Sequence, residues 1–137
     1  MFIRRSSDLS RRAAPILFFL AALALRPSPG QCANYYVAPG GDDANPGTIA
    51  APVATLQRGQ TLANPGDTVF VRGGAYHVTE AQISRGYQSL FACVSFFDKS
   101  GTQAAPINYF AYPGEQPVFD FHDVHPANER VVGIYVT

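Results

Sequence analysis

The densest cluster of side chains that could carry acid–base or metal chemistry lies between residues 120 and 125. Asp120, His122, Asp123 and His125 offer carboxylates and imidazoles, the groups that proteins use as general acids, general bases and metal ligands. In an extended strand, Asp120 and His122 would share one face, and Asp123 and His125 the opposite face. This alternation separates the four groups unless Asp123 begins a loop. We therefore interpret the cluster as a polar loop and assign no catalytic residue and no metal ligand to it.

A second group of oxygen-bearing side chains consists of Asp42, Asp43 and Asn45. Carboxylate and amide oxygens are the ligands that calcium prefers. The same residue types, followed by Pro46 and Gly47, are also typical of a turn in which an Asx side chain bonds to nearby backbone. We expect such a turn, with a calcium site as the alternative.

Lys99 is the only lysine in the chain, and a lysine can act as a general base. It lies in the turn Asp98-Lys99-Ser100-Gly101, away from any clear cluster of carboxylates. We expect a solvated turn residue there, with a catalytic base as the alternative. Arg130 could pair with an acidic sugar, but it directly precedes a predicted strand and is interpreted as an exposed charge.

The composition excludes several classes of protein. The 137 residues carry 10 Lys+Arg and 10 Asp+Glu, so there is no cationic excess for binding nucleic acid. A hydrophobic share of 47% is too high for a disordered chain. Two cysteines form at most one bridge, which excludes a disulfide framework. The phosphate-binding Gly-Lys-Ser/Thr, Gly-x-Ser-x-Gly and Cys-x-x-Cys motifs are absent.

Residues 1–33 have the pattern of a secretory signal peptide. An arginine-rich start leads into the apolar run Ala13–Leu25, which is followed by small residues and prolines. The run is shorter than the roughly 20 residues of a membrane-spanning helix. We therefore expect a secreted protein, extracellular or periplasmic, with no stable membrane span. Cleavage is expected after Ala33. Cleavage after Gly30 is the alternative, because it places Ser28 and Gly30 at the small-residue positions.

Removal of this leader would change the charge and the cysteine content. Residues 34–137 hold 5 basic and 9 acidic side chains, so their net charge is 5 − 9 = −4. Cys93 would be the remaining cysteine, and its apolar neighbours predict a buried thiol that packs as a small hydrophobe. A twin-arginine signal at Arg11-Arg12 and a lipid anchor on Cys32 fit the surrounding residues less well.

One helix and a series of short strands are predicted for residues 34–137. The helix is expected over Pro52–Asn64, because proline suits a first helical position and the apolar side chains recur at helical spacing. The almost wholly apolar run Leu90–Phe97 predicts a strand buried on both faces. The other β-prone runs, bounded by Gly, Pro and Asp turns, are Tyr35–Val37, Thr68–Arg72, Tyr76–Val78, Ile107–Tyr112, Pro117–Phe121 and Val131–Val136.

The strand starts recur at similar spacings. Thr68 and Ala92 are 24 residues apart, as are Ile107 and Val131. Internal periods of about 20–50 residues suggest a solenoid. Strands of irregular length also permit a β-sandwich, which is the alternative architecture.

Two strings of residues resemble the start of a known family. They are NYYVAPGGDDANPGTIAAPVATLQRGQTLANPGDTVFVRGGAYHV and SGTQAAPINYFAYPGEQPVFDF. Together they resemble the N-terminal part of pectate lyases of polysaccharide lyase family nine. The resemblance covers Asn34 to Thr137 and implies an all-β fold: the first coils of a right-handed parallel β-helix with one short capping helix. Residues 34–137 would then be the N-terminal cap and first coils of a longer, truncated domain.

The physical requirements of a coiled sheet agree with this resemblance. An end coil exposes apolar core and unpaired backbone groups, so it needs a cap. The predicted helix before Thr68–Arg72 is well placed to provide one. Gly73-Gly74 would allow a tight bend between two faces of a coil. The interior would be filled from a set of apolar side chains whose direction the sequence leaves open: Val69, Val71, Phe110, Phe119 or Phe121.

The resemblance also implies a chemistry. Such lyases cleave pectate, an acidic polysaccharide, by β-elimination with calcium and a lysine base, on coils that lie beyond the matched part. We therefore expect this chain to lack the catalytic site and to hold no calcium of its own. A non-catalytic β-helix or surface protein, binding polysaccharide through aromatic side chains such as Tyr87 or Tyr109, is one alternative. An inactive gene fragment is the other.

Overall fold

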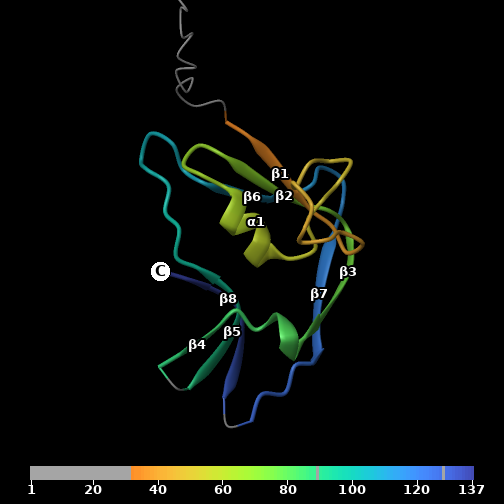
Figure 1. Cartoon of the computed structure of the whole chain (residues 1–137), viewed down its shortest axis with the longest axis vertical. Coiled ribbons are helices and arrows are strands. Elements are labelled where there is room, and N and C mark those ends of the chain that lie inside the picture. The colour runs from red at the N-terminus through yellow and green to blue at the C-terminus, as the bar shows by residue number, and fades with distance from the viewer. Residues whose placement is uncertain (1–31, 89, 128) are drawn as a thin grey trace, which may run out of the picture.

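The computed structural model describes residues 32–88, 90–127 and 129–137. The predicted leader therefore lies outside the described residues, except for Cys32 and Ala33. Within the described part, no helix is long and apolar enough to cross a membrane. The strands form three sheets on different sides of the coiled chain, with one short helix lying beside the first sheet (Figure 1).

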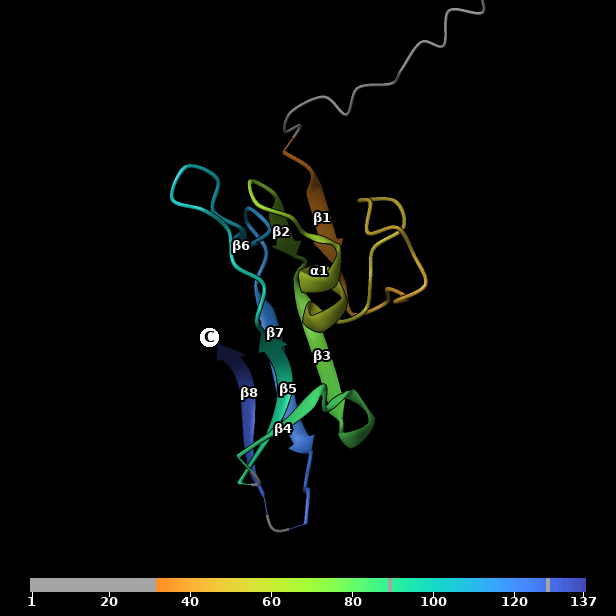
Figure 2. The same ribbon diagram turned by 60° about the vertical axis from the view of Figure 1, so that its left-hand side comes forward.

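Parallel pairing dominates the three sheets. Their strand orders are β1-β2-β6, β3-β7 and β4-β5-β8, and every pair is parallel except β4 with β5. Figure 2 shows the first sheet at the upper end of the molecule and the other two sheets side by side below it. The strand bounds are β1 Asn34–Val37, β2 Thr68–Val71, β3 Gly74–Thr79, β4 Arg85–Tyr87, β5 Phe91–Phe97, β6 Asn108–Ala111, β7 Pro117–Asp123 and β8 Arg130–Val136.

The chain passes through the three sheets in the same order twice. It runs through β2, β3 and β5, and then through β6, β7 and β8. Each strand of the second coil pairs with its counterpart in the first: Thr68 with Asn108, Gly74 with Pro117, and Phe91 with Arg130. This confirms the expected parallel β-helix. The alternative β-sandwich is wrong, because a sandwich is built from antiparallel sheets.

The predicted 24-residue period is not the coil repeat. The paired residues Thr68 and Asn108 are 40 positions apart, and Phe91 and Arg130 are 39 apart. A spacing near 24 residues instead separates the first and third faces of one coil, β2 from β5 and β6 from β8. Spacing in the sequence shows that strands recur but not which strands pair.

The strand predictions hold in position and differ at their ends. β5 is buried along its length from Ala92 to Phe97, as its apolar run predicts. β3 starts earlier and ends later than the predicted Tyr76–Val78, and β7 continues to Asp123. The 3-10 helix η1 (Glu80–Gln82) and the antiparallel strand β4 were not predicted.

The helix α1 spans Leu56–Leu62 and is shorter than the predicted Pro52–Asn64. It begins later because Val53 is extended and forms a bridge with Val37 of β1. Thr55 is the N-cap, and its side chain accepts a hydrogen bond from the Arg58 amide at 3.1 Å. Gly59 allows α1 to pack closely on the sheet, since a Cβ there would lie 3.0 Å from Val69 Cγ1 and 3.1 Å from Val37 Cγ2.

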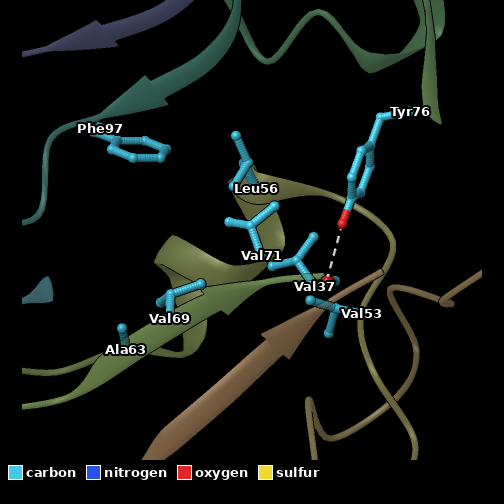
Figure 3. Packing of buried hydrophobic residues seen from close by; sticks show 8 residues of the cluster. All are labelled: Val37, Val53, Leu56, Ala63, Val69, Val71, Tyr76 and Phe97. Atoms are coloured by element: carbon cyan, nitrogen blue, oxygen red, sulfur yellow. Dashed lines mark hydrogen bonds between the residues drawn. The ribbon is translucent and has the colours of Figure 1, made fainter. Parts of the chain in front are cut away.

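The main core packs α1 against the first two sheets and includes Phe97 of the third sheet (Figure 3). Val69 and Val71 point inward and are buried, as is Val37 on the neighbouring strand β1. Phe119 is partly buried against this cluster, whereas Phe110, one of the candidates for the interior, is 55% exposed on the outside. The alternation along β6 thus turns Tyr109 inward, where it is partly buried, and Phe110 toward solvent.

The side chains of α1 cover the free edge of β5. The antiparallel strand β4 pairs with the first part of β5, Phe91 to Cys93. Further along, the Phe96 amide donates to Gln57 Oε1 at 2.8 Å, and the Gln60 amide group donates to Asp98 at 3.0 Å. α1 is therefore a cap in the physical sense, because Gln57 supplies a backbone amide of β5 with an acceptor that a neighbouring strand would otherwise provide.

The substitution Gln57→Ala should destabilise the protein by about 1 kcal/mol, because it removes the side-chain oxygen that accepts a hydrogen bond from the amide of buried Phe96. Urea denaturation followed by circular dichroism measures this loss. The exposed Gln103→Ala is the matched control, with an expected change within about 0.5 kcal/mol. Equal stability of the two variants would contradict the capping role of Gln57.

Candidate functional site

The cluster Asp120, His122, Asp123 and His125 lies on the outside of β7 and just beyond its end. Asp120 Oδ1 accepts from the His122 amide at 3.0 Å, and His122 Nδ1 lies 3.0 Å from Asp123 Oδ1. The His122 and His125 rings meet edge to face, with centroids 6.2 Å apart. The structure thus brings these side chains together more closely than strict alternation predicts.

A β-bulge causes this approach. His77 pairs with Asp120 and Thr79 pairs with Asp123, so β7 uses one residue more than β3 between the two pairs. Strand alternation is interrupted there, and His122 can contact Asp123. The prediction of a polar loop from Asp123 is therefore wrong: Asp123 is still in the strand, and only His125 lies beyond it.

Hydrogen bonds within this cluster shift the pKa values of two of its members. The hydrogen bond from the His122 amide lowers the pKa of Asp120, and the hydrogen bond with Asp123 raises the pKa of His122. The side chains of His122 and Asp123 are 84% and 73% exposed, so water screens both groups. Across the described residues, no three His, Cys, Asp or Glu side chains are arranged to hold a metal ion.

The oxygens of Asp42, Asp43 and Asn45 serve the loop that leads into α1. Asp42 Oδ1 accepts from the Ala44 amide, which is the geometry of an Asx turn. Asp43 accepts from the Ala54 and Thr55 amides at 2.9 Å and from the Thr55 hydroxyl at 2.7 Å. Calcium takes six to eight oxygen ligands, and a carboxylate that already accepts three hydrogen bonds is poorly suited to provide them.

Lys99 closes the other end of α1. Its ammonium group donates to the carbonyl oxygen of Thr61 at 2.8 Å and to that of Ala63. These carbonyls belong to the last turn of the helix, which lacks partners of its own and favours a cation. Lys99 is exposed, as predicted, but it is not a free turn residue. Its proton-bearing nitrogen is engaged by the backbone.

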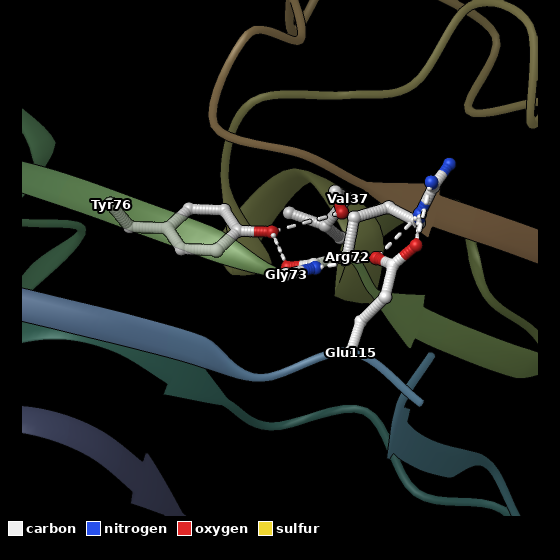
Figure 4. A network of polar contacts seen from close by, with 5 residues as sticks. All are labelled: Val37, Arg72, Gly73, Tyr76 and Glu115. Atoms are coloured by element: carbon white, nitrogen blue, oxygen red, sulfur yellow. Dashed lines mark hydrogen bonds and ion pairs between the residues drawn. The ribbon is translucent and has the colours of Figure 1, made fainter. Parts of the chain in front are cut away.

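A polar network that the sequence did not reveal joins the two coils at the corner after β2 (Figure 4). Arg72 and Glu115 form a two-pronged ion pair, with Nη2 2.7 Å and Nε 2.8 Å from the carboxylate oxygens. Glu115 also accepts from the Gly73 amide at 2.6 Å. The hydrogen bond with Arg72 lowers the pKa of Glu115 and raises that of Arg72.

Tyr76 completes this corner from the inside. Its hydroxyl donates toward the Arg72 carbonyl oxygen at 2.7 Å and lies 3.0 Å from that of Val37, and its ring stacks on Phe119 at 4.6 Å. Burial raises the pKa of Tyr76 to about 12. The network therefore holds three successive passes of the chain in register.

The aromatic side chains separate into inner and outer sets. Tyr109, one of the predicted sugar-stacking residues, is turned inward and stacks on Phe97 at 4.6 Å. Burial raises its pKa to about 12. The side chain of Tyr87, the other candidate, lies outside the described part. On the outer face of the first sheet, the rings of Tyr36 and Phe70 stack with their centroids 5.7 Å apart. The Phe110 ring lies next to that of Phe70, with a centroid distance of 6.5 Å.

Cys93 and Arg130 are placed as the sequence predicted. Cys93 is completely buried, and desolvation raises the pKa of its thiol, which disfavours the reactive thiolate. Arg130 begins β8 and is exposed.

A cavity of about 580 Å³ lies between the cap and the second and third sheets. Its wall is mainly apolar, with polar side chains contributed by α1, η1 and the loop before α1. The residues that line it include Asp43, Gln57, Val78, Gln82, Val94, Phe119 and Phe121. Such a lining supports packing or the uptake of an apolar group rather than proton transfer.

This architecture has counterparts among known proteins. Residues 35–137 match the family model "Pel9A-like, right handed beta helix region". Pectate lyase PEL9 of Emericella nidulans (strain FGSC A4) is 37% identical over 89 residues, which is 64% of this chain and 18% of that protein. Pectate lyase L of Dickeya chrysanthemi is 31% identical over 106 residues, 75% of this chain and 23% of that protein. The chain thus spans about a fifth of the length of these curated relatives.

Two solved structures have a similar fold. A rhamnogalacturonan lyase superposes with a TM-score of 0.71 at 40% identity and covers 76% of this chain and 25% of its own. The crystal structure of pectate lyase Pel9A superposes with a TM-score of 0.54 at 30% identity, over 76% of this chain and 24% of its own.

Replacement of Lys99 by alanine should lower the free energy of unfolding by about 0.5–1 kcal/mol, because two carbonyls at the end of α1 lose their donor. Urea denaturation measures the change. The neighbouring Ser100→Ala is the control and should behave like the wild type. A stability of Lys99→Ala equal to that of the control would show that the helix cap contributes nothing.

Low pH should lower the stability of the folded protein, in part because Glu115 becomes protonated. Its pKa in the folded state lies below the ordinary value of 4.5, so its contribution is present above pH 4.5 and is lost as pH falls through the folded pKa. Melting temperatures recorded between pH 7 and pH 3 should therefore fall less steeply for Glu115→Gln than for the wild type. Glu129→Gln serves as the control. An unchanged slope in Glu115→Gln would refute the role of the ion pair.

Proposed function

The chain belongs to the Pel9A-like right-handed β-helix family, and on this premise we propose that it is the N-terminal part of an exported polysaccharide lyase. Its substrate would be an acidic, uronate-containing polysaccharide such as pectate or rhamnogalacturonan. The observation that carries the proposal is the continuous family match from residue 35 to residue 137. It is supported by relatives that are named lyases of these two polymers.

In this proposal the leader directs export and residues 34–137 build the start of the enzyme. The cap helix and the first two coils provide paired strand edges on which further coils can form. Coils of a solenoid are stabilised mainly by their neighbours, so a capped start raises the stability of all that follows. The contribution of this part to the enzyme is structural: it holds the register of the sheets.

The elimination chemistry would reside in coils that follow in a longer chain. β-Elimination removes a proton next to a carboxylate, which requires a cation to neutralise the carboxylate and a base to take the proton. In this part the ammonium of Lys99 is engaged by α1, and the carboxylate of Asp43 is engaged by the cap loop. These side chains do not fit a calcium-and-lysine site, so we assign no step of the reaction to them.

The chain by itself should release no unsaturated uronate product from polygalacturonate or rhamnogalacturonan, with calcium or with a chelator. Ultraviolet absorbance of the unsaturated product measures this, and a full-length relative is the positive control. Calcium-dependent product formation by the purified chain would overturn the placement of the active site beyond residue 137. In that case Lys99→Ala would be the first variant to assay.

A further inference from the structure

Asp67 is a buried carboxylate that binds the backbone just before the first strand. The residue is 5% exposed. Its Oδ1 accepts from the Ala33 amide at 2.7 Å and its Oδ2 from the Asn64 amide at 2.8 Å. Its own carbonyl oxygen accepts from the Asn108 amide of the next coil at 3.0 Å. Asp67 thus connects the strand before it, the end of the cap helix and the coil that follows.

Ala33 is already part of the first sheet. Besides the bond from its amide to Asp67, its carbonyl oxygen accepts from the Thr68 amide at 2.9 Å. The pairing of β1 with β2 begins at Asn34 and Thr68, so Ala33 extends that ladder by one bond. Both polar groups of its backbone are engaged in the fold.

These contacts bear on where the leader is removed. Cleavage after Ala33, the position expected from the sequence, would remove the amide that donates to Asp67 and the carbonyl oxygen that accepts from Thr68. The buried Oδ1 of Asp67 would then lack its Ala33 donor. An unsatisfied buried charge is among the costliest defects in a fold. A cut on the N-terminal side of Ala33 leaves the same contacts in place.

We propose that the leader is cleaved before Ala33, so that the exported protein retains this residue as the first member of its sheet. The step is hydrolysis of one peptide bond by a leader protease of the host. Water supplies the hydroxyl of the new carboxylate and a proton of the new amine. The inference rests on the proposed export, but it concerns a different bond from the one that the residue pattern alone favoured.

Two bonds satisfy both the fold and the requirement for small residues. A cut after Gly30 places Ser28 and Gly30 at the small positions, and a cut after Cys32 places Gly30 and Cys32 there. After the second cut, the new α-ammonium of Ala33 would form an ion pair with Asp67. After the first, the amide bond is kept and the exposed Cys32 remains in the protein.

Secretion of the full 137-residue chain from a bacterial host, followed by intact mass measurement of the exported product, tests the proposal. A mass corresponding to a start at Gln31 or at Ala33 supports it. A start at Asn34 or later overturns this inference while leaving export intact. A product that keeps Met1 overturns the proposed export and this inference together.

A second measurement tests the physical basis independently of the protease. In the 137-residue chain that still carries the leader, Ala33→Pro removes the amide hydrogen that Asp67 binds, whereas Ala33→Gly keeps it. Cys32→Pro is the matched proline control, because the described residues show no partner for that amide. Ala33→Pro should lower the melting temperature by several degrees relative to both controls. If all three variants melt together, the Ala33–Asp67 contact does not secure the start of the chain.

Discussion

The structure depends on satisfying the free backbone edge at the start of a coiled parallel sheet. The strands of a β-helix pair with a neighbour on each side. In the first coil β2 pairs with β1, but no parallel strand of the described residues precedes β3 or β5. Side chains supply the missing partners: Gln57 accepts from the Phe96 amide, and Asp67 accepts from the amides of Ala33 and Asn64. Lys99 in turn donates to the last carbonyls of the helix that carries Gln57. The cap is thus a chain of interactions in which each member positions the next.

This constraint also explains why polar residues that look reactive in the sequence have structural partners. Asp43 and Lys99 carry groups that a lyase could use, a metal-binding carboxylate and an amine. In the fold one holds the loop before α1 and the other closes the helix. A cap must present a surplus of donors and acceptors to unpaired backbone, and these are the same functional groups that catalysis requires. A high number of polar side chains near the start of a solenoid therefore does not by itself indicate its active site.

The fold could be predicted further than the site. The apolar run that became β5 and the β-prone segments around β2, β6 and β8 stand where local pattern placed them. The ion pair of Arg72 with Glu115 was not foreseen, because 43 residues separate its members and no local signal links them. The bulge that joins His122 to Asp123 was missed for a related reason: it arises from the mismatch between β3 and β7, which neither strand contains alone.

The sequence by itself determined the class of the protein, because hydrophobic run lengths, turn residues and the resemblance of its opening segments all depend on local order. It determined that one helix precedes the first strong strand and that the strands recur. Only the tertiary structure decided which strands pair, that a coil takes about 40 residues, and that Tyr109 faces inward while Phe110 faces water. Those outcomes depend on contacts between residues far apart in the chain. A one-residue change in register would reverse every inward and outward assignment, and no local pattern contains that information.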